Sequence, residues 1–137
     1  MNVQGQVAVV TGGGGGIGGA VSRRLVAAGA RVVVADLDGD AAAKVADGLG
    51  ADAVAIGADV SSVEGIDEVL ALAADHFGPV DVYCANAGVA GAQGLGDSDE
   101  EWARTIDVNV LAHVRAARLL LPGWLERGSG YFVATAS

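Results

Sequence analysis

The chain has 137 residues, of which 52% are hydrophobic and 18% are charged, a composition that excludes a disordered chain and suits one globular domain with its own core. Eight lysines and arginines stand against 17 aspartates and glutamates, so the formal net charge is −9. Because such an acidic chain repels phosphate backbones and anionic lipids, we expect neither nucleic acid nor a membrane as a partner.

Cysteine usage and apolar run lengths bear on where the protein resides. Cys84 is the single cysteine, so no internal disulfide can form, and its apolar neighbours indicate a buried thiol. We expect no signal peptide before the first strand, and no uninterrupted apolar run of about 18 residues predicts a membrane span. These features favour a cytoplasmic protein, and we assign no metal-ligating residue.

Apolar residues follow two alternating patterns along the chain. Continuous apolar runs are typical of strands buried on both faces of a parallel sheet, and apolar residues four positions apart are typical of helices with one buried face. In chain order these patterns predict a strand at Gln6–Val10, a helix from Gly18 to Ala28, a strand at Arg31–Ala35, a helix from Asp38 to Gly50, a strand that begins with Ala53–Ile56 and ends near Asp59-Val60, a helix from Ser61 to Phe77, a strand at Val80–Ala85, a loop at Val89–Asp97, a helix from Ser98 to Leu121 and a strand at Tyr131–Ala134. This alternation predicts an α/β fold, with a parallel sheet between two layers of helices.

Residues with capping or helix-breaking chemistry set the expected helix ends. Asp38 is placed to cap the second helix, and Ser61 with Glu64, like Ser98 with Glu101, has the spacing of a capping box. Helix stops or kinks are expected at Gly29, Gly78-Pro79 and Pro122. The apolar face of the long helix comprises Ile106, Val110, Val114, Ala117 and Leu121.

The stretch Thr11–Gly18 joins the first strand to the first helix through Gly12, Gly16 and Gly18. Glycines let the backbone turn tightly and let a ligand approach, while the free amides and positive end of the following helix face an anion. The turn therefore predicts a phosphate-binding site. Three alternatives remain open for the glycines alone: low complexity, a purely steric turn, or the cofactor site of a methyltransferase.

Asp36 ends the second strand, 18 residues beyond Gly18, near the spacing of about 20 at which a carboxylate binds the ribose of a dinucleotide. The same carboxylate would repel a 2′-phosphate, and neither Leu37 nor Gly15 offers a positive charge to offset that repulsion. NAD is therefore favoured over NADP. The alternative is an aspartate that merely ends the strand in solvent.

Asn86-Ala87-Gly88 follows the fourth strand. Ligands of open parallel sheets bind at the carboxyl ends of the strands, so we expect this turn to face the same crevice as the glycine stretch. Taken alone, it could be an ordinary turn stabilised by asparagine.

Taken together, these motifs resemble those of one family, the short-chain dehydrogenases/reductases of the classical type. Its nucleotide motif, Thr-Gly-x-x-x-Gly-x-Gly, is matched within Thr11–Gly18, and its Asn-Asn-Ala-Gly motif is matched by Ala85–Gly88 with Ala in the first place. The remaining matches are Asp59-Val60, Asp107–Val110, Leu121-Pro122 and Gly130–Val133. The motifs that contain Asn86 and Asn109 are not expected in methyltransferases, which argues against that alternative. The motifs occur in the family's order along the whole chain.

The resemblance implies a Rossmann-type doubly wound sheet, NAD as cofactor, and hydride transfer between nicotinamide and a small alcohol or ketone. It places Asp59 beside the adenine ring, Asn109 in a proton relay and Ser137 on the substrate oxygen. The cofactor-binding set it implies is Thr11, Gly12, Gly15, Gly16, Ile17, Gly18, Asp36, Leu37, Asp59, Val60, Asn86, Ala87 and Gly88. Relatives are commonly dimers or tetramers through the long helix, which predicts a homo-oligomer here.

The family's acid/base pair, Tyr-x-x-x-Lys, is missing. Neither Tyr83 nor Tyr131 is followed by lysine at the fourth position, and the only lysine is Lys44. Two hypotheses follow. In the first, residues 1–137 are the single NAD-binding domain of a dehydrogenase, truncated after strand five and inactive alone, with the apolar edge at Phe132–Ala134 left unpaired. In the second, the chain is a non-catalytic NAD-binding module.

Overall fold

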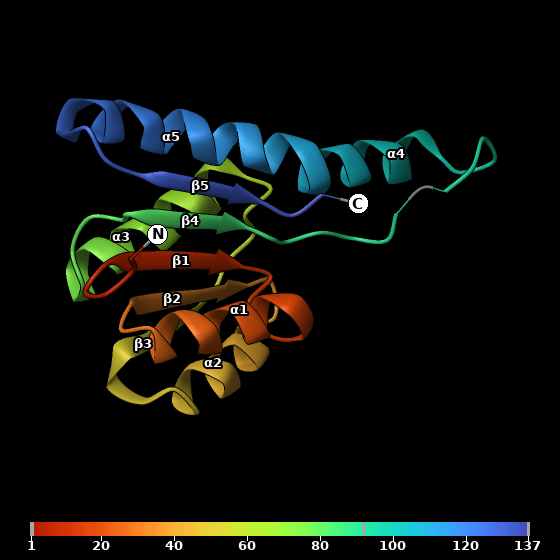
Figure 1. The fold of residues 1–137 in the computed structure, drawn as a ribbon. Coiled ribbons are helices and arrows are strands. Elements are labelled where there is room, and N and C mark those ends of the chain that lie inside the picture. The colour runs from red at the N-terminus through yellow and green to blue at the C-terminus, as the bar shows by residue number, and fades with distance from the viewer. Residues whose placement is uncertain (1, 92, 137) are drawn as a thin grey trace.

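A five-stranded parallel sheet is the middle layer of the computed structural model, which describes residues 2–91 and 93–136 (Figure 1). The strand order is β3-β2-β1-β4-β5, and each neighbouring pair runs parallel. The strands are β1 (Val7–Thr11), β2 (Arg31–Asp36), β3 (Ala53–Gly57), β4 (Val82–Ala85) and β5 (Tyr131–Ala134). The predicted doubly wound α/β class is confirmed, since the order reverses between β1 and β4 as that topology requires.

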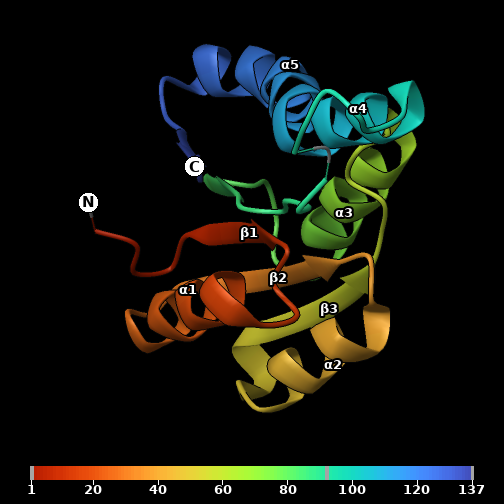
Figure 2. The same cartoon turned by 90° about the vertical axis from the view of Figure 1, so that its right-hand side faces the viewer.

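Helices cover both faces of the sheet. They are α1 (Gly16–Ala27), α2 (Gly39–Asp47), α3 (Val63–His76), α4 (Asp99–Ile106) and α5 (Ala112–Arg127), with a 3₁₀ turn η1 (Gly50–Asp52) and a π-helical segment η2 (Asp107–Leu111). Figure 2 looks onto the carboxyl ends of the strands and shows α1 and α2 on one side, with α3 and α5 on the other. Among the described residues, none of these helices has the length and apolar character needed to cross a bilayer.

The core divides into two clusters because successive side chains of a strand point to opposite faces. Val9, Val33 and Tyr83 belong to the cluster under α3 and α5, whereas Val10 and Cys84 belong to the one under α1 and α2. β1 is buried along its whole length, as its continuous apolar run predicts. The Cys84 thiol is buried as expected, and that burial raises its pKa.

Several expected boundaries were wrong in detail. The third strand ends at Gly57 rather than near Asp59-Val60, and the fourth begins at Val82 rather than Val80. The first helix begins at Gly16, since the turn closes earlier than the apolar stripe indicates. The second ends at Asp47, because Gly50 has φ +77 and cannot continue a right-handed helix. Ser61 does not form the predicted capping box with Glu64. Instead, the Ser62 hydroxyl accepts the amide of Gly65 at 3.0 Å, and α3 starts one residue later than that box would require.

The long helix is continuous from α4 through η2 into α5, and it begins with the predicted capping box of Ser98 and Glu101. Pro122 neither ends nor visibly breaks it, and the helix stops at Gly128, whose φ is +69. The face that packs on the sheet is not the predicted apolar one. Ala112, Ala116, Leu120 and Trp124 are buried, whereas Ile106, Val110, Val114 and Leu121 are exposed.

The corrected cap of α3 gives a stability prediction. Ser62→Ala removes the acceptor of the Gly65 amide and should lower the free energy of unfolding by about 1 kcal/mol, a typical value for an N-cap. Ser61→Ala leaves that acceptor in place and should cost less. Urea denaturation of the two variants measures the difference, and a larger loss in Ser61→Ala would contradict the assigned cap.

Candidate functional site

A cavity of about 730 Å³ lies at the carboxyl ends of the strands. It brings together eleven residues of the predicted cofactor-binding set: Gly12, Gly15, Ile17, Gly18, Asp36, Leu37, Asp59, Val60, Asn86, Ala87 and Gly88. Parallel strands place all their carboxyl ends on one edge, so segments distant in the sequence meet there. The two remaining members, Thr11 and Gly16, do not line the cavity.

The glycine stretch wraps tightly around the end of β1. Gly12 has φ +62, and a Cβ there would lie 2.9 Å from the Cα of Ala87. A Cβ on Gly18 would lie 2.1 Å from the carbonyl oxygen of Gly12, so both positions exclude a side chain. α1 has no side-chain cap at Gly15 and no acidic residue in its first turn. Its first amides therefore remain available to an anion in the cavity.

Thr11 ties the glycine stretch to the turn after β4. Its Oγ1 donates to the carbonyl oxygen of Cys84 at 3.3 Å and accepts the amides of Asn86 and Ala87, each at 3.0 Å. Asn86 Nδ2 returns a hydrogen bond to the Thr11 carbonyl at 3.1 Å. Thr11 is only 2% exposed, so its hydroxyl joins two walls of the cavity rather than facing a ligand.

Asp36 is held by backbone amides at the mouth of the cavity. Its Oδ2 accepts the amide of Gly14 at 2.9 Å, and its Oδ1 accepts the amide of Asp38 at 3.0 Å. A carboxylate oxygen can accept two hydrogen bonds, so each oxygen keeps capacity for a ligand. The carboxylate is thus oriented by the same turn that offers the amides of α1.

Asn109 lies in the π-helical segment, and its amide binds the backbone of Val89. Oδ1 accepts the Val89 amide at 2.8 Å, and Nδ2 donates to the Val89 carbonyl at 3.0 Å. A second cavity of about 500 Å³ lies here, lined by residues 86–90 with Asn109, Val110, Thr135 and Ala136. The side chain of Asn109 therefore fixes the loop that walls this cavity. Ser137, the expected substrate-binding serine, lies outside the described residues.

The two tyrosines are unsuited to acid/base chemistry in these cavities. Tyr83 is 1% exposed and stacks on Phe132 with ring centroids 5.5 Å apart, and its burial raises the pKa of the phenol. Tyr131 begins β5 at the amino edge of the sheet, opposite the cavity. Their positions agree with the sequence, in which neither belongs to a Tyr-x-x-x-Lys pair.

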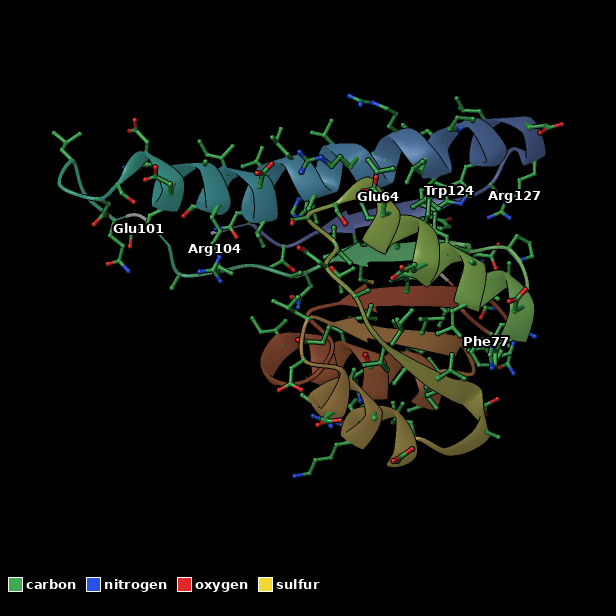
Figure 3. The ribbon with its side chains drawn as sticks, turned by 180° about the vertical axis from the view of Figure 1, so that it is seen from behind. Glu64, Phe77, Glu101, Arg104, Trp124 and Arg127 are labelled. Carbon is green, nitrogen blue, oxygen red and sulfur yellow. The ribbon has the colours of Figure 1, made fainter. Side chains whose placement is uncertain are left out.

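Sequence reasoning missed part of the lining of the larger cavity: Ala58, Ser61, Val89, Arg104, Val108 and Thr135. Val108 lies within the matched segment Asp107–Val110 and Ser61 follows the matched Asp59-Val60, which was a usable signal, whereas Arg104 has none. Figure 3 shows the Arg104 side chain extending from α4 toward the loop after β4. Of the described residues that line this cavity, Arg104 alone carries a positive charge.

Comparison with known proteins agrees with this geometry. The family model for short chain dehydrogenases matches residues 6–137, and the chain belongs to that family. It is 41% identical over 144 residues to a 1-deoxy-11-beta-hydroxypentalenate dehydrogenase of Streptomyces avermitilis, covering 100% of this chain and 53% of the relative. An uncharacterized oxidoreductase of Staphylococcus aureus is 37% identical, with 96% of this chain and 58% of the relative covered.

Solved structures show the same fold. A 3-ketoacyl-(acyl-carrier-protein) reductase from Brucella melitensis, complexed with NADH, matches with a TM-score of 0.92 and 32% identity over 98% of this chain and 58% of its own. A 7 alpha-hydroxysteroid dehydrogenase complexed with NADH and 7-oxo glycochenodeoxycholic acid matches with a TM-score of 0.92 and 29% identity, covering 99% of this chain and 55% of its own. The chain spans about half the length of the curated relatives it matches.

The Thr11 hydroxyl gives a prediction for the integrity of the site. Thr11→Val keeps the shape but leaves two amides and a carbonyl without their partner, which should lower the free energy of unfolding by about 2–3 kcal/mol. Thr11→Ser retains the hydroxyl and should cost clearly less. Denaturant titration compares the pair, and equal losses would contradict the assigned role of Oγ1.

Proposed function

We propose that this chain forms the NAD-binding domain of an oxidoreductase that moves a hydride between nicotinamide and an alcohol or ketone. The proposal rests on one observation: Asp36 and the uncapped start of α1 line the same cavity at the carboxyl edge of the sheet. Two similar solved structures are described as NADH complexes, which supports NAD as the cofactor.

The residues present fit each part of a dinucleotide. A pyrophosphate requires exposed amides and close backbone approach, which Gly12 and the first turn of α1 offer. An adenosine ribose requires an oriented acceptor for its two hydroxyls, which Asp36 offers. Val60 and Val108 also line the cavity, and apolar residues of this kind suit contact with a flat base. Bound NAD would supply the hydride chemistry, and this chain would bind and orient it.

The selectivity for NAD over NADP rests on charge. A 2′-phosphate would lie against the Asp36 carboxylate, and the neighbouring Leu37 and Gly15 carry no charge. Leu37 is 72% exposed at the cavity mouth, so it would contact the adenosine without compensating a phosphate. Like-charge contact of this kind excludes a ligand even where the space would admit it.

Substrate handling is proposed for the second cavity. Asn109 would keep the Val89 loop in place beside the nicotinamide, and Ser137 would donate a hydrogen bond to the substrate oxygen. The proton donor would be a Tyr-x-x-x-Lys pair, which these 137 residues lack, so turnover would need residues additional to them. A cytoplasmic location fits this chemistry. If the chain acts without such a pair, it is an NAD-binding module.

We also propose that two or more copies associate through the long helix. Ile106, Val110, Val114 and Leu121 are between 45% and 52% exposed along α4, η2 and α5, which is unusual for a row of large apolar side chains. A contiguous exposed apolar surface of this kind marks an interaction site. Pairing the same face of two copies would bury it with two-fold symmetry.

The cofactor proposal predicts the result of calorimetry. NAD should bind more tightly than NADP, and Asp36→Arg should weaken NAD by roughly 10- to 100-fold, the loss expected for hydrogen bonds to a charged group, while improving NADP. Asp47→Arg makes the same change of charge on the exposed end of α2 and should alter neither affinity. Tighter binding of NADP by the unmodified protein would contradict the proposal.

The association proposal predicts a change of mass in solution. Val114→Asp places a charge in the exposed apolar row and should convert an oligomer into a monomer in sedimentation experiments. Val63→Asp, on α3 with 40% exposure, is the matched control and should leave the mass unchanged. An unmodified protein that sediments as a monomer at all concentrations would exclude this association.

A further inference from the structure

Arg115, in the first turn of α5, connects the long helix to the loop that follows β3. Its Nη1 donates to the carbonyl oxygen of Ser61 at 2.5 Å, and its Nη2 pairs with Asp107 Oδ1 at 2.9 Å. The guanidinium is planar and its donors are fixed in a fork, so two simultaneous bonds restrict its position strongly. Arg115 itself does not line either cavity, whereas Ser61 lines the larger one.

Ser61 passes this restraint on to Asp59. The Ser61 amide donates to Asp59 Oδ1 at 3.0 Å, and the Ser61 hydroxyl donates to the same oxygen at 2.6 Å. Both bonds end on Oδ1, so the orientation of the carboxylate follows the position of Ser61, whose carbonyl, in the next peptide group, is the atom that Arg115 holds. Asp59 is an exposed side chain at the cavity wall, so without these bonds it would sample several rotamers.

We propose that Arg115 is a positioning residue for the adenosine end of the cofactor, acting through Ser61 on the Asp59 carboxylate. The inference rests on the proposed function, and adds to it that Asp59, which lines the same cavity as Asp36, would accept a hydrogen bond from the adenine. An acceptor held in one orientation before binding loses less conformational entropy when the ligand arrives. Removing the Arg115 bonds frees the Ser61–Ser62 peptide and with it the backbone and hydroxyl of Ser61. The affinity for the adenine half of the cofactor then falls, although Arg115 does not touch the cofactor.

The same helix supplies a matched control. Arg127, labelled in Figure 3 near the far end of α5, donates to the carbonyl oxygen of Val80 and pairs with Asp81 at 3.2 Å. Arg127 thus also joins α5 to one carbonyl and one carboxylate, and the side chains of the two arginines are similarly exposed, at 27% and 29%. Its partners lie at the amino edge of the sheet, away from both cavities.

The test compares Arg115→Met and Arg127→Met, with each protein confirmed as folded by circular dichroism at the assay temperature. NADH binding is followed by its fluorescence, and AMP and nicotinamide mononucleotide are titrated as competitors that each carry one phosphate. Arg115→Met should weaken NADH and AMP by about 3- to 10-fold and leave nicotinamide mononucleotide within about 2-fold. Arg127→Met should leave all three unchanged. Arg115→Lys, a milder change, should give an intermediate loss for AMP.

A double-mutant cycle separates positioning from general loosening of the fold. Asp59→Ala removes the carboxylate, so Arg115→Met should cause no further loss of AMP affinity in that background. Additive losses, or equal losses of AMP and nicotinamide mononucleotide, would overturn the inference. Unchanged AMP binding in Arg115→Met would also overturn it while leaving the proposed function intact. If the unmodified protein failed to bind NADH, the proposed function and this inference would both fall.

Discussion

The junction between β1 and β4 is the constraint on which the rest of the site depends. The chain builds outward from β1 through β2 to β3, then returns to start β4 on the other side of β1. A gap for a ligand opens where the direction reverses, and Thr11 and Asn86 close that gap at its base through their mutual hydrogen bonds. Without this connection, the glycine stretch and the turn after β4 would be separate loops rather than two walls of one cavity.

Electrostatics inside the cavity differ from those of the whole chain. The protein carries a formal net charge of −9, yet the site that would receive a pyrophosphate has no acidic residue in the first turn of α1. At the start of α1 the positive potential comes from backbone amides and the helix dipole, and Arg104 adds a positive side chain elsewhere in the cavity lining. The carboxylates of Asp36 and Asp59 line the same cavity, where they would accept hydrogen bonds from a sugar and a base.

The long helix has two different sides, one packed on the sheet and one exposed. Its small residues Ala112 and Ala116 allow close packing on the sheet, and Trp124 anchors the far end through a hydrogen bond from Nε1 to the carbonyl of Val80 at 2.8 Å. The opposite side leaves a row of large apolar residues exposed. Between α4 and α5, the π-helical segment places Asn109 against Val89, and such segments are frequent at functional sites because they re-aim side chains. One helix therefore orders the loop beside the second cavity with one side and exposes an apolar row with the other.

Local patterns in the sequence determined the strands, the glycine turn and the aspartate that ends β2, because each depends on residues adjacent in the chain. The predicted strand at Tyr131–Ala134 is confirmed to the residue, and the capping box of Ser98 and Glu101 forms as its spacing indicates. That Ser62 rather than Ser61 caps α3 was visible only in the structure. The Ser61 hydroxyl donates a hydrogen bond to Asp59, and the Ser62 hydroxyl accepts the amide of Gly65. The packed face of the long helix could not be predicted from the pattern either, because apolar residues occur on both of its sides and only the fold decides which of them face the sheet. The link from Arg115 to Ser61 joins residues 54 positions apart, and only the folded chain brings them within hydrogen-bonding distance.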